Sequence, residues 1–171
     1  KNIQQDIIDG TVYELNYCRE VFAENVTLNP VNIFLKINEK AKAPFSAYFK
    51  INDKYALSFS PERFMQIKDS KLLSQPIKGT VKKGSSAEEN TLLKNQLLHD
   101  EKERAENVMI VDLVRNDFAR SAETGSVKVD ELFGIYEFEN IIQMISTVTA
   151  IKRKEINSLD ALKNAFPMGS M

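Results

Sequence analysis

The sequence is poor in the side chains that form disulfides and zinc sites. It has one cysteine, Cys18, and one histidine, His99, in 171 residues. One cysteine cannot form an intramolecular disulfide, and one cysteine with one histidine is fewer ligands than an ordinary zinc site requires. This cysteine usage is typical of a reducing compartment, so we expect a cytoplasmic protein.

The chain also lacks a charge excess and a membrane-length apolar run. Lysine and arginine number 23 against 24 aspartates and glutamates, which gives a formal net charge of -1. No overall field therefore attracts nucleic acid or an anionic membrane. No apolar run approaches the roughly 20 residues that span a bilayer, and residues 1–10 do not resemble a signal peptide. We expect neither nucleic acid nor a membrane as partner, and any charged ligand must be bound at a local site.

With 43% hydrophobic and 27% charged residues, the chain has the composition of one domain with a core. Periodicity predicts helices at 2–9, from Pro30 to before Pro44, at 88–120 with a break near His99, and at 158–166. It predicts strands at 12–23, 45–51, 55–60, 63–68, 72–81, 126–129 and 141–152. Strand runs grouped apart from helix runs, with short turns between them, favour an α+β fold of mainly antiparallel sheet with flanking helices.

Both ends of the sequence indicate a longer protein. Position 1 is Lys1 rather than an initiator methionine, and residues 166–171 form a turn-like apolar segment that would ordinarily lead into a further element. We therefore expect residues 1–171 to be part of one larger domain whose C-terminal part is missing.

Two acidic residues in the predicted helix near 100–120 are candidate metal ligands. Glu103 and Glu106 are three positions apart, so they share a helix face and could converge on a hard cation. The alternative is a solvated helix start, where acidic side chains complement the helix dipole. Asp112 and Arg115 follow inside an apolar stretch, and ionic groups buried there would need partners.

A lysine at the end of a predicted strand is a candidate nucleophile. Lys78 lies between apolar Ile77 and flexible Gly79, where partial desolvation would lower its pKa and make the amine reactive. Gly79 would let a ligand approach the backbone, and Thr80 could donate a hydrogen bond. The alternative is a surface lysine in a turn. Glu62 is likewise either an acid of a site or a turn residue paired with its neighbour.

Six blocks, in this order and spacing, resemble the chorismate-utilising enzymes. This group includes anthranilate, aminodeoxychorismate, isochorismate and salicylate synthases, and the resemblance covers nearly the whole chain. The blocks are SFSPERF (58–64), PIKGT (76–80), KERAENVMIVDLVRND (102–117), GSVKV (125–129), QMISTVTA (143–150) and FPMGS (166–170). The resemblance implies the anthranilate synthase component I-like fold and a chorismate-binding catalytic domain.

Two positions discriminate among the activities of this group. Anthranilate synthases have alanine in the middle of the PIxGT block, whereas aminodeoxychorismate-forming members have a lysine that attacks C2 of chorismate; here it is Lys78. Isochorismate and salicylate synthases use another lysine, whose place here is near Glu14. The resemblance therefore implies a transaminase-class synthase that converts chorismate and ammonia to 4-amino-4-deoxychorismate for p-aminobenzoate and folate. The ammonia would come from a glutamine amidotransferase partner.

The same resemblance assigns roles to individual residues. Glu62 would protonate the departing C4 hydroxyl, which needs a carboxyl kept protonated by its surroundings. Glu106 would be a direct Mg²⁺ ligand and Glu103 a nearby acid. Gly79 and Thr80 would line the substrate pocket.

Three departures from the family pattern leave two alternatives open. Gln143, placed among the substrate-binding residues, stands where many members have a histidine, and Met168 replaces a glycine. The chain also stops before later blocks that bring further Mg²⁺ ligands, so we expect little or no turnover from these residues alone. The first alternative is an anthranilate synthase large component in which Lys78 is incidental. The second is a catalytically inactive binding module with the same fold.

Overall fold

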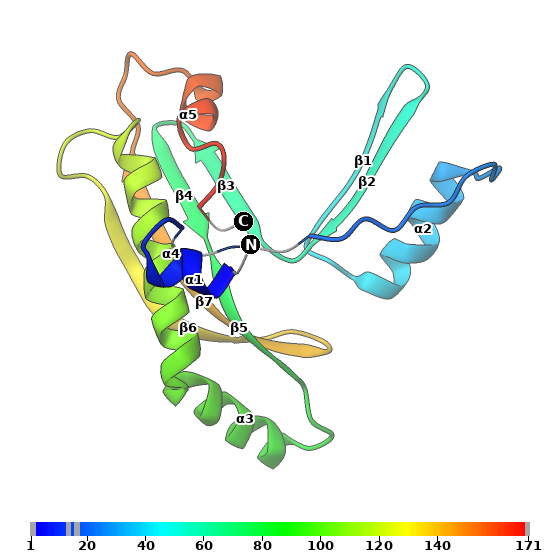
Figure 1. Cartoon of the computed structure of the whole chain (residues 1–171), viewed down its shortest axis with the longest axis horizontal. Coiled ribbons are helices and arrows are strands. Elements are labelled where there is room, and N and C mark those ends of the chain that lie inside the picture. Colours follow the sequence, from blue (N-terminus) through cyan, green and yellow to red (C-terminus); the bar gives the residue numbers. More distant parts are fainter. Residues whose placement is uncertain (1–2, 13–14, 16–17, 170–171) are drawn as a thin grey trace.

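The computed structural model describes residues 3–12, 15 and 18–169 (Figure 1). The fold is α+β, as the sequence predicts. The helices are α1 (Ile3–Ile8), α2 (Pro30–Ala41), α3 (Ala87–His99), α4 (Glu101–Ala119) and α5 (Ser158–Asn164). The strands are β1 (Phe45–Ile51), β2 (Lys54–Ser60), β3 (Arg63–Lys68), β4 (Lys71–Gln75), β5 (Ile77–Lys82), β6 (Lys128–Glu137) and β7 (Ile141–Ile151).

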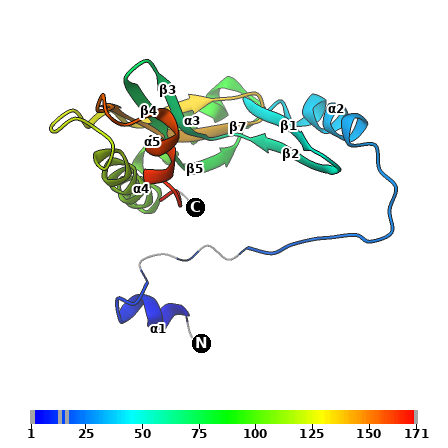
Figure 2. The ribbon, with the colours of Figure 1, turned by 90° about the horizontal axis from the view of Figure 1, so that it is seen from above.

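One predicted strand is absent from the described part of the chain. Residues 12, 15 and 18–23 belong to no strand, so the prediction of a strand at 12–23 is wrong there; positions 13, 14, 16 and 17 lie outside the described residues. The segment alternates apolar and polar side chains, but a strand also needs a neighbouring strand for its backbone hydrogen bonds. In Figure 2 residues 18–23 run apart from the sheet.

A five-stranded antiparallel sheet, counted over the described residues, is built around β7. The path runs β3-β4-β7-β5, and β6 pairs with the other edge of β7. The sequence predicted one strand at 72–81, but Pro76 divides it into β4 and β5, because proline has no N–H for the ladder. The carbonyl of Pro76 still accepts a hydrogen bond from Ser146 N–H at 3.1 Å, so both strands remain on the same edge of β7.

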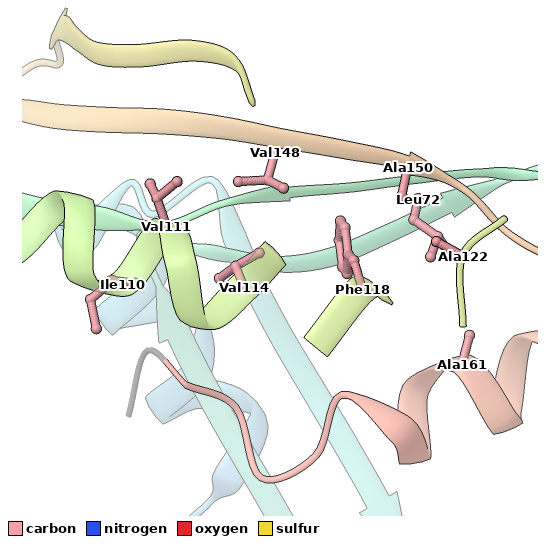
Figure 3. Packing of buried hydrophobic residues seen from close by; sticks show 9 residues of the cluster. All are labelled: Leu72, Ile110, Val111, Val114, Phe118, Ala122, Val148, Ala150 and Ala161. Atoms are coloured by element: carbon pink, nitrogen blue, oxygen red, sulfur yellow. The ribbon is translucent and has the colours of Figure 1, made fainter. Parts of the chain in front are cut away.

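Helix α4 forms the core by packing its apolar face on this sheet. The cluster drawn in Figure 3 is fully or nearly buried and comprises Leu72, Ile110, Val111, Val114, Phe118, Ala122, Val148, Ala150 and Ala161. The four α4 members are spaced as one helix face requires. Figure 2 shows α4 and α5 on one side of the sheet. We call β3 to β7 with α3, α4 and α5 the sheet unit.

The strands β1 and β2 form a hairpin that extends away from the sheet unit (Figure 1). Helix α2 packs on it: the Phe34 ring stacks on Phe59 with centroids 5.3 Å apart and meets the edge of Tyr48 at 5.7 Å. The side chain of Asn29 caps α2 by accepting a hydrogen bond from Asn32 N–H at 3.0 Å. We call α2, β1 and β2 the hairpin unit.

No helix among the described residues combines the length and the apolar character needed to cross a lipid bilayer.

Candidate active site

A bulge in β5 presents the predicted nucleophile. Ile77 pairs with Ile145 and Thr80 with Gln143, so the register shifts between them and Lys78 and Gly79 form the irregular stretch. Lys78 is half-buried. A β-bulge next to a site is a common way to redirect a side chain.

Gly79 allows the bulge to approach the helices. Its φ is +92°, and an added Cβ would lie 3.0 Å from Leu97 Cδ1 and 3.3 Å from Glu103 Cβ. Any other residue would be strained and crowded at this position. The structure therefore brings the β5 bulge and Glu103 of α4 together, although the two are distant in the sequence.

Thr80 and Gln143 face the other side of the sheet. Gln143 Nε2 donates a hydrogen bond to Thr80 Oγ1 at 3.3 Å, and Gln143 is only 5% exposed. Its neighbours Ile142 and Met144 pack with Leu97 on the helix side. Because successive side chains of a strand alternate between faces, Gln143 points away from the helices. The predicted substrate-binding residues are thus divided: Thr80 and Gln143 lie together on one face of the sheet, and Gly79 approaches the helices on the other.

The start of α4 carries the two predicted metal ligands. Asp100 Oδ1 accepts a hydrogen bond from Glu103 N–H at 2.9 Å and so caps the helix where the carboxylate turn begins. Lys102 Nζ lies 3.6 Å from Glu103 Oε1 and 3.2 Å from Glu106 Oε1. The hydrogen bond and charge of Glu106, followed by the charge of Glu103, raise the pKa of Lys102. The exposed ammonium group of Lys102 thus lies near both carboxylates.

The chemistry of this pair fits part of a magnesium site. Mg²⁺ is often held by one or two carboxylates, with water and substrate oxygens completing the coordination. Over residues 3–12, 15 and 18–169, no group of three or more histidine, cysteine, aspartate or glutamate side chains is placed to hold a metal. The donors predicted for a metal here are thus two carboxylates, Glu103 and Glu106, which are of the oxygen type that Mg²⁺ takes.

Glu62 lies in the turn between β2 and β3. Its N–H donates to Ser60 Oγ at 3.2 Å, which fixes the turn, and its side chain is half-buried. The preceding Pro61 lines a cavity of about 190 Å³ together with Ile77, the residue before Lys78. The residues that line this cavity include the chain neighbours Pro61 and Ile77, but neither Glu62 nor Lys78.

The expectation that Asp112 and Arg115 are buried is wrong for this chain. Their side chains are 75% and 50% exposed and pair with each other at 2.8 Å on the surface of α4. The apolar face of α4 is formed by Ile110, Val111 and Val114, and a helix cannot turn every residue of such a stretch toward one sheet.

A polar network between α4 and the sheet was missed from the sequence. Asn107 is 1% exposed, and its Oδ1 accepts a hydrogen bond from Ser146 Oγ at 2.5 Å. The sequence contains one signal for it, a polar residue on the otherwise apolar face of α4. Near the other end of the helix, Asp117 accepts a long hydrogen bond from Gly169 N–H at 3.4 Å, and burial raises the pKa of Asp117. Glu14, the predicted place of the other lysine, lies outside the described residues.

Comparisons with known proteins identify the family. The profile described as chorismate binding enzyme matches residues 1–171. The chain belongs to the chorismate binding enzyme family. The resemblance inferred from the six sequence blocks is thereby confirmed. As a member of this family, the chain has the anthranilate synthase component I-like fold.

Relatives within the chorismate binding enzyme family include synthases of two kinds. The chain is 38% identical over 171 residues to aminodeoxychorismate synthase component 1 of Klebsiella aerogenes, which is 100% of this chain and 38% of that protein. It is 43% identical over 129 residues to anthranilate synthase component 1 of Bacillus subtilis (strain 168), which is 75% of this chain and 25% of that protein.

A solved structure agrees with the family assignment. The crystal structure of anthranilate synthase component I from Streptococcus pneumoniae TIGR4 has a TM-score of 0.72 and 32% identity, over 84% of this chain and 31% of that chain. The chain therefore spans less than half the length of these relatives.

Proposed function

We propose that this chain is part of an aminodeoxychorismate synthase component I, which converts chorismate and ammonia to 4-amino-4-deoxychorismate for p-aminobenzoate and folate synthesis. The ammonia would come from a glutamine amidotransferase partner, and the protein would work in the cytoplasm. The observation that carries the proposal is the β5 bulge, where half-buried Lys78 precedes a glycine packed against Glu103. The backbone next to Lys78 thus meets a carboxylate-bearing turn of α4, which suits a substrate that must be attacked while its own carboxylates are held.

The reaction would proceed in two displacements. The neutral Lys78 amine forms a bond to C2 of chorismate while the C4 hydroxyl leaves as water, with its proton supplied by the Glu62 carboxyl. Ammonia then forms a bond to C4, and the bond between C2 and the Lys78 nitrogen breaks. After loss of one proton from the new amine, the sum is chorismate plus ammonia to 4-amino-4-deoxychorismate plus water.

The two α4 carboxylates would help to bind the substrate through a metal ion. Glu106 as a direct ligand and Glu103 beside it would bind Mg²⁺, which when bound neutralises the carboxylate of chorismate. Gly79 would leave room for the substrate at the bulge, and Thr80 with Gln143 would complete the binding residues. Lys102, which contacts both carboxylates, would compete with a metal bound there.

Product analysis on the complete protein tests the proposal. The protein receives chorismate, Mg²⁺ and an ammonium salt, and the product is identified by chromatography. We expect 4-amino-4-deoxychorismate from the wild type and none from Lys78→Ala. The matched control is Lys82→Ala, an exposed lysine on the same strand, which should keep the activity. Glu62→Gln should slow the reaction by about 10²-fold or more, as loss of a general acid does. An active Lys78→Ala variant would refute the nucleophile.

Anthranilate synthase is the second candidate, and one observation favours it: the 43% identity to anthranilate synthase component 1 of Bacillus subtilis over 129 residues. In that case chorismate would yield anthranilate and pyruvate, and Lys78→Ala would leave the rate nearly unchanged. The same chromatogram therefore separates the two synthases, and absence of both products would favour an inactive binding module.

We also expect residues 1–171 alone to have little or no turnover, because the described part of the chain offers two carboxylates for the metal rather than a full ligand set. Steady-state product formation by this piece would contradict that expectation.

A further inference from the structure

Asn107 is a buried polar residue that the proposed reaction does not use. It follows Glu106 directly and lies one helical turn after Glu103, on the face of α4 that packs against the sheet. Ser146 of β7, which is 0% exposed, donates its hydroxyl hydrogen to Asn107 Oδ1 at 2.5 Å. This buried hydrogen bond connects the turn of α4 that carries Glu103 and Glu106 directly to the central strand β7.

The link continues into β6. Ser146 Oγ accepts a hydrogen bond from the backbone N–H of Phe133 at 3.1 Å. Phe133 lies in a bulge between Glu131 and Gly134 and has a φ of +63°, so its N–H is turned out of the ladder. One hydroxyl thus joins the helix to an unusual backbone conformation, which persists only where its surroundings hold it.

The same bulge contacts α4 at a second place. The Arg104 guanidinium, next to Glu103, lies 4.4 Å from the centroid of the Phe133 ring. Two consecutive turns of α4 are therefore attached to Phe133, one through the ring and one through Ser146. Together with the apolar packing of α4 on the sheet, these two attachments resist rotation of the helix about its own axis at its N-terminal end.

Packing alone does not explain an amide at position 107. Asn107 Nδ2 is buried without a hydrogen-bond partner in the described part of the chain. Rotating the amide by 180° would bring Nδ2 to Ser146 and leave Oδ1 without a donor instead. A leucine of similar shape would avoid the cost of an unpaired buried polar atom, so the reason for the amide is the bond to Ser146.

We propose that Asn107 is a positioning residue, which through Ser146 and the Phe133 bulge fixes the rotation of α4 that presents Glu103 and Glu106 to a cation. The proposal rests on the proposed function, in which these two carboxylates bind Mg²⁺. Their tips lie roughly 5 to 6 Å from the helix axis, so a rotation of about 20° displaces them by about 2 Å. Mg²⁺ requires oxygen distances of about 2.0 to 2.1 Å, so this displacement removes a ligand.

Mg²⁺ affinity, measured by titration calorimetry on the complete protein without substrate, is the first readout. We expect Asn107→Leu and Ser146→Ala each to weaken Mg²⁺ binding about 10-fold, as loss of a residue that orients metal ligands commonly does. Ser146→Thr keeps the hydroxyl and should restore binding. The double variant Asn107→Leu/Ser146→Ala should be no weaker than either single one, because both act on one link. In turnover assays the Mg²⁺ concentration for half-maximal rate should rise, with kcat at saturating Mg²⁺ largely kept.

Val114→Ala is the matched control, because Val114 is buried on the same face of α4 and takes no part in the hydrogen bonds. Its unfolding midpoint should fall while its Mg²⁺ affinity stays within about twofold of the wild type. The proposal is overturned if Asn107→Leu binds Mg²⁺ like the wild type, or if Val114→Ala loses affinity in proportion to its lost stability. Ser146→Ala carries the same test if Asn107→Leu does not fold.

Two further outcomes separate this inference from the proposed function. If the wild type binds Mg²⁺ through Glu103 and Glu106 but forms anthranilate, the proposed function fails while the affinities of the Asn107 and Ser146 variants still support the inference. If neither Glu103→Gln nor Glu106→Gln changes Mg²⁺ binding, the carboxylates are not ligands and the inference is overturned with the metal site.

Discussion

The sheet unit and the hairpin unit use the same alternating strand pattern with opposite results. In the sheet unit Leu72, Met144 and Val148 are completely buried, because α3 and α4 cover one face of the strands. In the hairpin unit, all of which the structure describes, no residue is buried, and Phe49 of β1 is 59% exposed. Alternation is therefore enough to form a hairpin, but burial requires a covering layer that is wide enough. The short helix α2 covers one part of its hairpin through Phe34.

The largest expected effect is at the center of the sheet unit. Phe118→Ala should lower the free energy of unfolding by about 3 to 5 kcal/mol, because it opens a cavity in the buried cluster between α4 and the sheet. Phe34→Ala in the hairpin unit should cost about 1 kcal/mol, since that ring is half-buried. Denaturant titration of both variants measures the difference. Equal losses would show that the two units are equally well packed.

Helix caps should show the same contrast at a smaller scale. Asp100→Ala and Asn29→Ala each remove an N-cap, worth about 1 kcal/mol. Loss of the Asp100 cap should shift the global unfolding midpoint, because α4 belongs to the core. Loss of the Asn29 cap should appear mainly as faster hydrogen exchange of α2 amides, because α2 can open locally. Asp100→Asn keeps the cap and serves as the control. A shift of the global unfolding midpoint in Asn29→Ala would show that the two units unfold together as one cooperative structure.

A charge cluster gives the sheet unit a pH-dependent contribution. Glu137 lies 2.6 Å from Lys83 Nζ and 2.5 Å from Lys94 Nζ, and hydrogen bonds to these two lysines lower the pKa of Glu137 from 4.5 to about 2. A carboxyl with a depressed folded-state pKa stabilises the protein above its unfolded pKa, and this stabilisation is lost as the pH falls from about 4.5 toward 2. In urea titrations across this range, the wild type should lose more stability than Glu137→Gln. If the stabilities of the two proteins fall in parallel with pH, the cluster does not contribute to the pH dependence of stability.

The smallest effect is expected for the ion pair that bridges the two units. Lys42 Nζ, at the end of α2, lies 2.5 Å from Glu139 Oε1 in the turn after β6, and both side chains are more than half exposed. A double-mutant cycle with Lys42→Gln and Glu139→Gln should give a coupling below about 1 kcal/mol that vanishes at high salt. A larger coupling would mean that the orientation of the hairpin unit depends on this pair.

Local pattern was sufficient for most element boundaries. The predicted strands at 45–51 and 63–68 coincide with β1 and β3, and the helix break near His99 falls at Asp100, which ends α3 and caps α4. These boundaries depend on neighbouring residues, which are visible in a sequence. The strand predicted at 12–23 failed because a strand depends on a partner, and the strand predicted at 126–129 was too short because β6 continues through its bulge.

The candidate site could be predicted as residue types but not as an arrangement. The acids of α4 and the glycine of β5 were visible in the sequence, whereas the contact between Gly79 and Glu103 depends on how α4 lies across β5. The opposite faces of Gly79 and Thr80 follow from the alternation of a strand, whereas the pairing of Thr80 with Gln143 becomes visible only in the register of β5 on β7. Asp112 and Arg115 were misjudged because an apolar stretch on a helix buries one face rather than its whole length.

The central place of β7 has a consequence for how the chain is made. Gln75 at the end of β4 and Thr147 of β7 are neighbours in the fold but lie 72 positions apart in the sequence. Strands β4 and β5 therefore leave the ribosome long before β7, which joins them. At a synthesis rate of about 5 to 20 residues per second, they wait roughly four to fourteen seconds with unpaired edges. During that interval the nascent chain presents a template for pairing with other chains. Its yield in the cell should therefore depend on chaperones that cover strands during translation, and on codon usage between β5 and β7.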